Sequence, residues 1–154
     1  MTTELRGSFD LVEFLRDRLD EDFEAVRLVL GVNVMAAIRH GKSAPRWVPS
    51  PKSDAGVWDT DGVPRVKFVW ARERDHIIRH DPARVLAEVE AKRSLIARGD
   101  TLFCECNFAD APPTNPDDRS QQIPHHYDCT AYRIAQVLAL PYADHPDYRV
   151  EWRP

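Results

Sequence analysis

The segment SFDLVEFLRDRLDEDFEAVRLVL, residues 8–30, decides how the N-terminal part of this chain folds. Its apolar residues recur at steps of three or four, with acids and arginines between them: Val12, Leu15, Leu19, Phe23, Val26 and Leu30. This period is typical of an amphipathic helix, for which Ser8 is a plausible N-cap. Gly31 either ends the helix or marks a bend before NVMAAIRH, residues 33–40, which could add two more turns up to Gly41.

The residues that follow, 42–64, are rich in Ser, Pro, Gly, Asp and Trp, which favours turns and short extended pieces. Within and after them, GVWDTDGVPRVKFVW (56–70) predicts a β-hairpin that turns at Asp59 to Gly62. Val66, Phe68 and Trp70 would share one strand face, and Pro64 would lie at an edge or at the start of its strand. We therefore expect two or three short antiparallel strands.

Three further helices are predicted in the C-terminal half. ARERDHIIRH (71–80) favours a short helix, and Asp81 followed by Pro82 is a strong start for a second, which we expect to run to about Arg98 with Gly99 as its cap. TAYRIAQVLAL (130–140) favours a last helix. The extended tail after it should pack on the rest of the chain through its aromatic side chains, Tyr142, Tyr148 and Trp152.

The expected fold class is α+β: a small, mainly helical domain with a short antiparallel hairpin sheet and a zinc-closed loop. A chain of 154 residues has the usual size of one domain, so we expect a single domain over 1–154. Its parts would be an N-terminal helical segment (1–41), a hairpin region (42–70), helices (71–99), a Cys/His loop (100–129) and a C-terminal helix with an aromatic tail (130–154).

Charge and hydropathy exclude some classes of protein. A net charge of -4 argues against a protein that holds nucleic acid by its overall field. No apolar run approaches the roughly 20 residues that cross a bilayer, and MTTELRGSFD has no features of a signal peptide. We expect a cytoplasmic protein without a membrane partner, in a compartment where disulfides are disfavoured.

All three cysteines lie at the ends of one polar loop, CECNFADAPPTNPDDRSQQIPHHYDC (104–129). Cys104 and Cys106 would point to the same side of an extended segment, and HHYDC adds His125, His126 and Cys129. Two pairs of such ligands separated by a loop match a structural zinc site, in which four N or S ligands form a tetrahedron. The ligands would be the three cysteines and one of the two histidines. The alternative is that the cysteines are small buried apolar residues and the histidines lie on a solvated turn.

Two enzymatic alternatives are open. His76 and His80 are four residues apart on the predicted short helix, next to Asp81, which is the spacing of a helical metal pair. HIIRH lacks the Glu that follows the first His in zinc proteases, so a packed or solvent-facing pair is the simpler interpretation. Cys104 or Cys106 beside a histidine could also act as a nucleophile, but it would compete with zinc for the same residues.

Trp47, Trp58 and Trp70 lie in or beside the hairpin, interleaved with cations: Arg46, Lys52, Arg65, Lys67 and Arg72. Aromatic and basic residues on a small sheet can stack the bases of single-stranded nucleic acid. The simpler interpretation, which we prefer here, is that the aromatic residues fill the core of the sheet and the cations form its wet face.

Three motifs carry a resemblance to a family. LVEFLRDRLDED (11–22), HIIRHDPARVLAEVEAKRSLI (76–96) and LALPYADHPDYRVEWRP (138–154) resemble an uncharacterised family of actinobacteria and their phages. SAPRW (43–47) with DHIIRHDPARVLAEV (75–89) is more loosely similar to phage early-region accessory proteins. This second similarity implies an accessory role in phage or prophage biology. The resemblance to the uncharacterised family also implies a CxxC-like pair and a later Cys before the last helix. This chain keeps the later cysteine as Cys129 but has CEC in place of the first pair.

From these patterns we expect a zinc-stabilised, non-enzymatic binding or adaptor protein with a protein partner. Loop 107–124 and the hairpin surface would supply the partner contacts. The competing classes are a metal-dependent hydrolase or nucleic-acid-processing enzyme, and a nucleic-acid binding module on the Trp and Arg rich hairpin.

Overall fold

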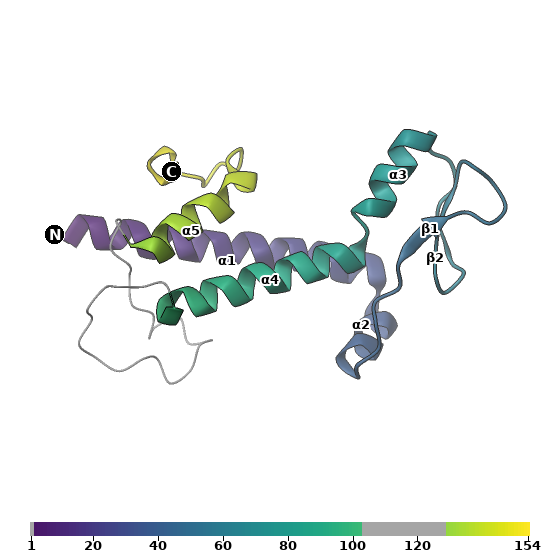
Figure 1. Cartoon of the computed structure of the whole chain (residues 1–154), viewed down its shortest axis with the longest axis horizontal. Coiled ribbons are helices and arrows are strands. Elements are labelled where there is room, and N and C mark those ends of the chain that lie inside the picture. The colour runs from purple at the N-terminus through teal and green to yellow at the C-terminus, as the bar shows by residue number, and fades with distance from the viewer. Residues whose placement is uncertain (1, 103–128) are drawn as a thin grey trace. The chain divides into compact units, whose positions relative to one another are not determined.

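A computed structural model describes residues 2–102 and 129–154, with side chains described in 10–97 and 129–154. The fold class is α+β and mainly helical, as the sequence predicts (Figure 1). The described elements are α1 (Thr2–Leu30), α2 (Val32–Arg39), β1 (Trp47–Pro49), β2 (Val57–Asp59), β3 (Pro64–Val66), α3 (Ala71–Arg79), α4 (Pro82–Leu102), α5 (Thr130–Ala139) and the 3-10 turns η2 (Leu140–Tyr142) and η3 (Val150–Trp152).

The chain divides into two compact units. Unit 1 comprises Met1–Asp20 and Ala91–Pro154, and unit 2 comprises Glu21–Glu90. Both α1 and α4 pass from one unit into the other. That the chain folds as one cooperative domain stays a prediction. The expected zinc-closed loop falls largely on 103–128, outside the described residues. Among the helices that are described, none combines the length and the apolar character that a membrane span requires.

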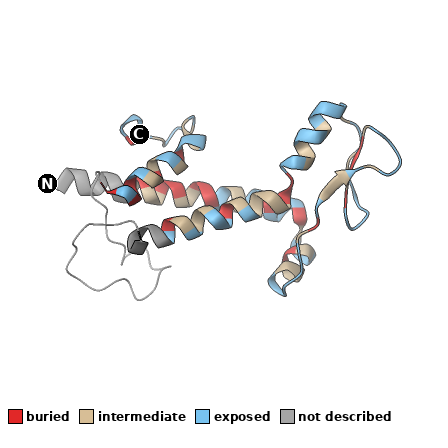
Figure 2. Ribbon diagram, in the orientation of Figure 1, coloured by how far each residue is buried: buried red, intermediate tan, exposed pale blue. Residues whose placement is uncertain are grey.

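Helix α1 confirms the N-terminal pattern and begins earlier than predicted, at Thr2. Leu15, Leu19, Val26 and Leu30 are buried, as the helical period requires (Figure 2). Helix α1 ends at Leu30 because Gly31 has φ 81° and ψ 164°, a conformation that only glycine adopts without strain. The predicted additional turns exist as a separate helix, α2. Its Met35 packs into a small core with Val26 and Leu30.

The predicted hairpin is part of a three-stranded antiparallel sheet in the order β1-β2-β3. Trp47 pairs with Asp59, Val48 with Trp58, and Val57 with Val66. The backbone N–H of Gly62 donates to the carbonyl of Asp59 at 3.0 Å and closes the predicted turn. Pro64 begins β3, an edge strand, where its missing N–H costs no ladder bond.

The extent of β3 is a correction. The alternation of Val66, Phe68 and Trp70 predicted one strand face, but β3 ends at Val66, and Phe68 and Trp70 are 67% and 72% exposed. The physical reason is the short partner strand, because β2 begins at Val57. Beyond the paired segment the N–H of Val69 reaches the carbonyl of Ala55 at 2.7 Å, and the ladder does not continue. The preferred interpretation of Trp70 as a core residue of the sheet is therefore wrong.

Helices α3 and α4 meet at Asp81. Helix α3 ends with His80 as its C-cap, as predicted, and α4 begins at Pro82. The predicted end of the second helix at Gly99 is wrong, because α4 continues to Leu102. A glycine inside a helix costs only about 1 kcal/mol relative to alanine, which is too little to end a helix without other signals.

In unit 1 the aromatic tail packs as predicted. Trp152 is buried, and the rings of Phe14 and Trp152 have centroids 5.1 Å apart. Tyr148 contacts both rings, with centroids 5.8 Å from each. Arg18, a buried cation of α1, lies 3.0 Å from Nδ1 of His145, and Arg149 pairs with Asp10 at 2.8 Å. These contacts tie the tail to α1.

Candidate functional site

Of the predicted zinc ligands, only Cys129 falls on the described residues. Cys129 is buried and stands at the N-cap position of α5. Cys104, Cys106, His125 and His126 lie outside the described residues. Among the side chains described, those of residues 10–97 and 129–154, no three His, Cys, Asp or Glu gather as a possible metal site. The zinc site stays a prediction.

The two histidines of α3 lie together at the surface. The rings of His76 and His80 are tilted toward each other with centroids 4.5 Å apart, and both residues are exposed. The helical spacing therefore places them on one face, as predicted. Their neighbour in the sequence, Asp81, has a different environment.

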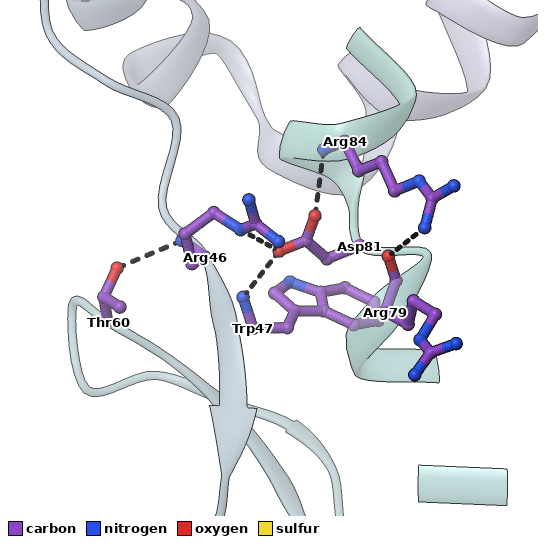
Figure 3. Close-up of polar contacts among 6 residues, drawn as sticks. All are labelled: Arg46, Trp47, Thr60, Arg79, Asp81 and Arg84. Atoms are coloured by element: carbon purple, nitrogen blue, oxygen red, sulfur yellow. Dashed lines mark hydrogen bonds and ion pairs between the residues drawn. The ribbon is translucent and has the colours of Figure 1, made fainter. Parts of the chain in front are cut away.

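Asp81 is fully buried, and both of its carboxylate oxygens accept hydrogen bonds (Figure 3). Oδ1 accepts the backbone N–H of Arg84 at 2.9 Å, which caps the first turn of α4. Oδ2 accepts Arg46 Nε at 2.5 Å and the backbone N–H of Trp47 at 3.1 Å. Arg84 also donates from Nη1 to the carbonyl of Arg79 at 3.4 Å. The carboxylate thus joins the start of β1 to the start of α4.

This arrangement gives Asp81 a structural role and removes it from the predicted helical metal pair. A carboxylate whose oxygens are already held by an Arg side chain and two backbone amides has little capacity left for a cation. Sequence reasoning identified the helix cap from the Asp-Pro pair. It missed Arg46 and Trp47, because nothing in the sequence indicates a contact between residues 35 positions apart.

Asp59 has a similar role inside the hairpin. Its side chain is fully buried, and Oδ1 accepts the N–H of Asp61 at 3.0 Å and that of Val63 at 2.8 Å. Oδ2 pairs with Arg65, with a closest N···O distance of 2.6 Å. Burial alone would raise the pKa of Asp59, but the hydrogen bonds from Val63 and Arg65 and the charge of Arg65 outweigh it and hold the pKa below its ordinary value.

Unit 2 contains an apolar pocket of about 550 Å³. Helices α1, α2 and α4 contribute most of its lining, and the loop after α2 adds one residue: Phe23, Arg27, Val32, Met35, Ile38, Arg39, Ala44, Leu86, Ala87 and Glu90. Arg27 is held by Glu24 in a two-pronged ion pair, and this hydrogen bond and charge raise the pKa of Arg27. Val32 lies at the rim and is 69% exposed, so the apolar lining continues onto the open surface.

A second surface feature of unit 2 surrounds the start of α3. Phe68 and Trp70 form an edge-to-face pair with ring centroids 5.6 Å apart, and both side chains face solvent. Lys67 and Arg72, which flank the pair in the sequence, are also exposed. The other two tryptophans of the hairpin, Trp47 and Trp58, are half-buried. Exposed aromatic rings are thus confined to one short segment of the sheet region.

These features define a small α+β protein with a pocket and an aromatic surface, and with buried carboxylates that serve as structural links. The chain belongs to the family of unknown function DUF6221, whose family model matches residues 8–154. The resemblance to an uncharacterised family is confirmed. No match was found to a curated protein or to a solved structure. The origin in actinobacteria and their phages, and the looser similarity to early-region accessory proteins, stay predictions.

Proposed function

We propose that this chain is a binding or adaptor protein without catalytic activity, and that the pocket of unit 2 receives the apolar face of an amphipathic helix from a protein partner. The observation that carries the proposal is the pocket itself, with its apolar lining and open rim. Helix-in-groove recognition uses such a site, because apolar side chains at helical spacing fill the groove.

The rim favours a helix over a small apolar molecule. Val32 lines the pocket and is 69% exposed, so part of the apolar lining stays open to solvent at the rim. A small ligand would bury little of that surface, whereas a helix can cover it. Arg39 and Glu90 are exposed lining residues that form no ion pair with another described residue. Arg39 could pair with an acidic side chain of the partner helix, and Glu90 with a basic one.

The experiment uses a pair of variants that add the same charge in and beside the pocket. Val32→Asp places a carboxylate on the rim, and Asn33→Asp places one at the next position, which does not line the pocket. Both lie in the first turn of α2, where an acid is favourable, so neither should impair folding. Peptides that bind the native chain would be selected from a displayed library of amphipathic helices. The affinity of each selected peptide would then be measured for all three proteins.

We expect Val32→Asp to lower the affinity for the selected peptides by about tenfold or more, because the new charge loses water on binding. Asn33→Asp should leave the affinity unchanged. Equal binding to native and Val32→Asp protein would refute the pocket as the site. Selection of no peptide, together with binding in the pocket of anilinonaphthalene sulfonate, a small anionic dye with apolar rings, would instead point to a small-molecule ligand.

We also propose that structural zinc closes the segment 104–129, with Cys104, Cys106, Cys129 and either His125 or His126 as ligands. The support is the ligand spacing and the place of Cys129 at the start of α5, where the positive end of the helix favours a thiolate. About one zinc per chain by elemental analysis, lost in Cys129→Ser together with thermal stability, is the expected result. Metal-free protein purified without chelator would contradict it.

A further inference from the structure

The surface around the start of α3 has a composition unlike that of the whole chain. Residues 63–80 contain five Lys or Arg and two Asp or Glu, although the chain carries a net charge of -4. Two of the five cations are held by neighbouring groups, since Arg65 pairs with Asp59 and Arg74 with Asp75. The side chains of the other three, Lys67, Arg72 and Arg79, are exposed and make no ion pair with a described residue.

Two of these cations, Arg72 and Arg79, lie on one face of α3. Arg72, His76 and Arg79 follow one another at steps of four and three, so they share a side of the helix. The exposed pair Phe68 and Trp70 immediately precedes that helix. We call this set the aromatic-basic surface: Lys67, Phe68, Trp70, Arg72, His76 and Arg79.

We propose that the aromatic-basic surface binds single-stranded nucleic acid, with bases stacked on Phe68 and Trp70 and phosphates held by the cations of α3. The two rings contact each other and are both exposed, so they form a small apolar patch, and such patches mark binding sites. Stacking on rings beside a row of cations is how single strands are bound without sequence preference. This inference does not depend on the pocket and adds a second ligand to the proposed adaptor.

A single strand fits better than a protein or a duplex. The unpaired charge on this surface is positive, which complements a phosphate backbone. A duplex would leave the two rings without bases to stack on, since its bases are already stacked on one another. Within 63–80 the two acids, Glu73 and Asp75, are exposed on α3, and Asp75 is paired with Arg74. Three cations without an ion pair to a described residue therefore stand against one such acid, Glu73.

The test measures binding of labelled oligothymidylate and oligouridylate to the full chain by fluorescence anisotropy, at several salt concentrations. Trp70→Ala and Phe68→Ala should each weaken binding roughly five- to a hundredfold, whereas Trp70→Phe should retain most of it. Val150→Ala, at an equally exposed apolar site of unit 1, is the matched control and should have no effect. The carbonyl and not the ring of Trp70 accepts the first helical bond of α3, so these variants should fold.

The electrostatic part has its own readout. For native protein, the logarithm of the affinity should fall linearly with the logarithm of the salt concentration. Lys67→Gln and Arg72→Gln should each reduce that slope by about 0.7. Lys42→Gln and Arg153→Gln, at exposed positions elsewhere, should leave it unchanged.

Three outcomes would overturn the proposal. The first is the absence of binding to either polymer at low salt, and the second is binding that Trp70→Ala does not change. The third is a protein that binds no oligonucleotide but whose mass in solution falls in Trp70→Ala, which would make this surface an interface between copies of the chain. Preference for DNA or for RNA would support the proposal equally and would identify the strand.

Discussion

At the scale of single residues, two buried carboxylates hold unit 2 together. Asp81 caps α4 and also accepts hydrogen bonds from the Arg46 side chain and the Trp47 backbone N–H, at the start of β1. Asp59 accepts two amides of its own turn and pairs with Arg65. In both cases a buried charge is tolerated because both of its oxygens accept hydrogen bonds.

Replacement of Asp81 by alanine should destabilise the protein by about 2 kcal/mol or more, since it removes a helix cap and leaves the amides of Trp47 and Arg84 without a partner. Asp81→Asn should cost less, because its amide oxygen still accepts one of these bonds. Denaturant unfolding would give both values. Asp54→Ala, at an exposed aspartate of the same unit, serves as the control and should change stability little.

The lowered pKa of Asp59 predicts a pH dependence of stability. The folded pKa lies below the unfolded value of about 3.9, so the contribution of Asp59 is present above that pH and is lost as pH falls through the folded pKa. Asp59→Asn should therefore cost about 1 to 3 kcal/mol at neutral pH, and the difference from native protein should shrink below pH 4. Unfolding curves at several pH values measure this. The exposed Asp61 gives the matched variant Asp61→Asn, for which a comparable loss would show that the effect belongs to the turn in general.

At the scale of elements, the break between α1 and α2 depends on one glycine. Gly31 has φ 81° and ψ 164°, and a Cβ at this position would meet no atom within 4 Å. Gly31→Ala should thus act through backbone strain alone and cost about 1 to 3 kcal/mol. Asn33→Ala, two residues on, should be neutral or slightly stabilising because alanine favours a helix. A Gly31→Ala variant as stable as native protein, measured by thermal unfolding, would indicate that α1 and α2 can join as one helix.

At the scale of the whole molecule, α1 and α4 each belong to both units. If one unit unfolded alone, α1 and α4 would each be cut in the middle, and the other unit would lose helical turns at its boundary. We therefore expect one cooperative unfolding transition. Helix content can be followed by circular dichroism, and unit 2 by tryptophan fluorescence in Trp152→Phe, which leaves Trp47, Trp58 and Trp70. Coincident curves are expected, and two separate midpoints would show that the units unfold independently.

Local patterns in the sequence are enough to predict most of the helices and the hairpin. Helical period predicted α1, α3, α4 and α5, the Asp81-Pro82 pair predicted the start of α4, and the turn residues Asp59 to Gly62 predicted the hairpin. Each of these patterns acts between residues a few positions apart. The sequence also identified Cys129 and the loop before it as a candidate zinc site, which stays a prediction.

How far β3 extends, what Asp81 binds and where the pocket lies depend on packing between distant segments, and the structure was needed to find them. Alternation alone could not place Phe68 and Trp70 in solvent, because a strand ends where its neighbour does, and the neighbour is 3 residues long. Asp81 meets Arg46 across 35 positions, and three separate helices line most of the pocket. Such contacts depend on packing between segments remote in the chain, for which a single sequence carries no local signal.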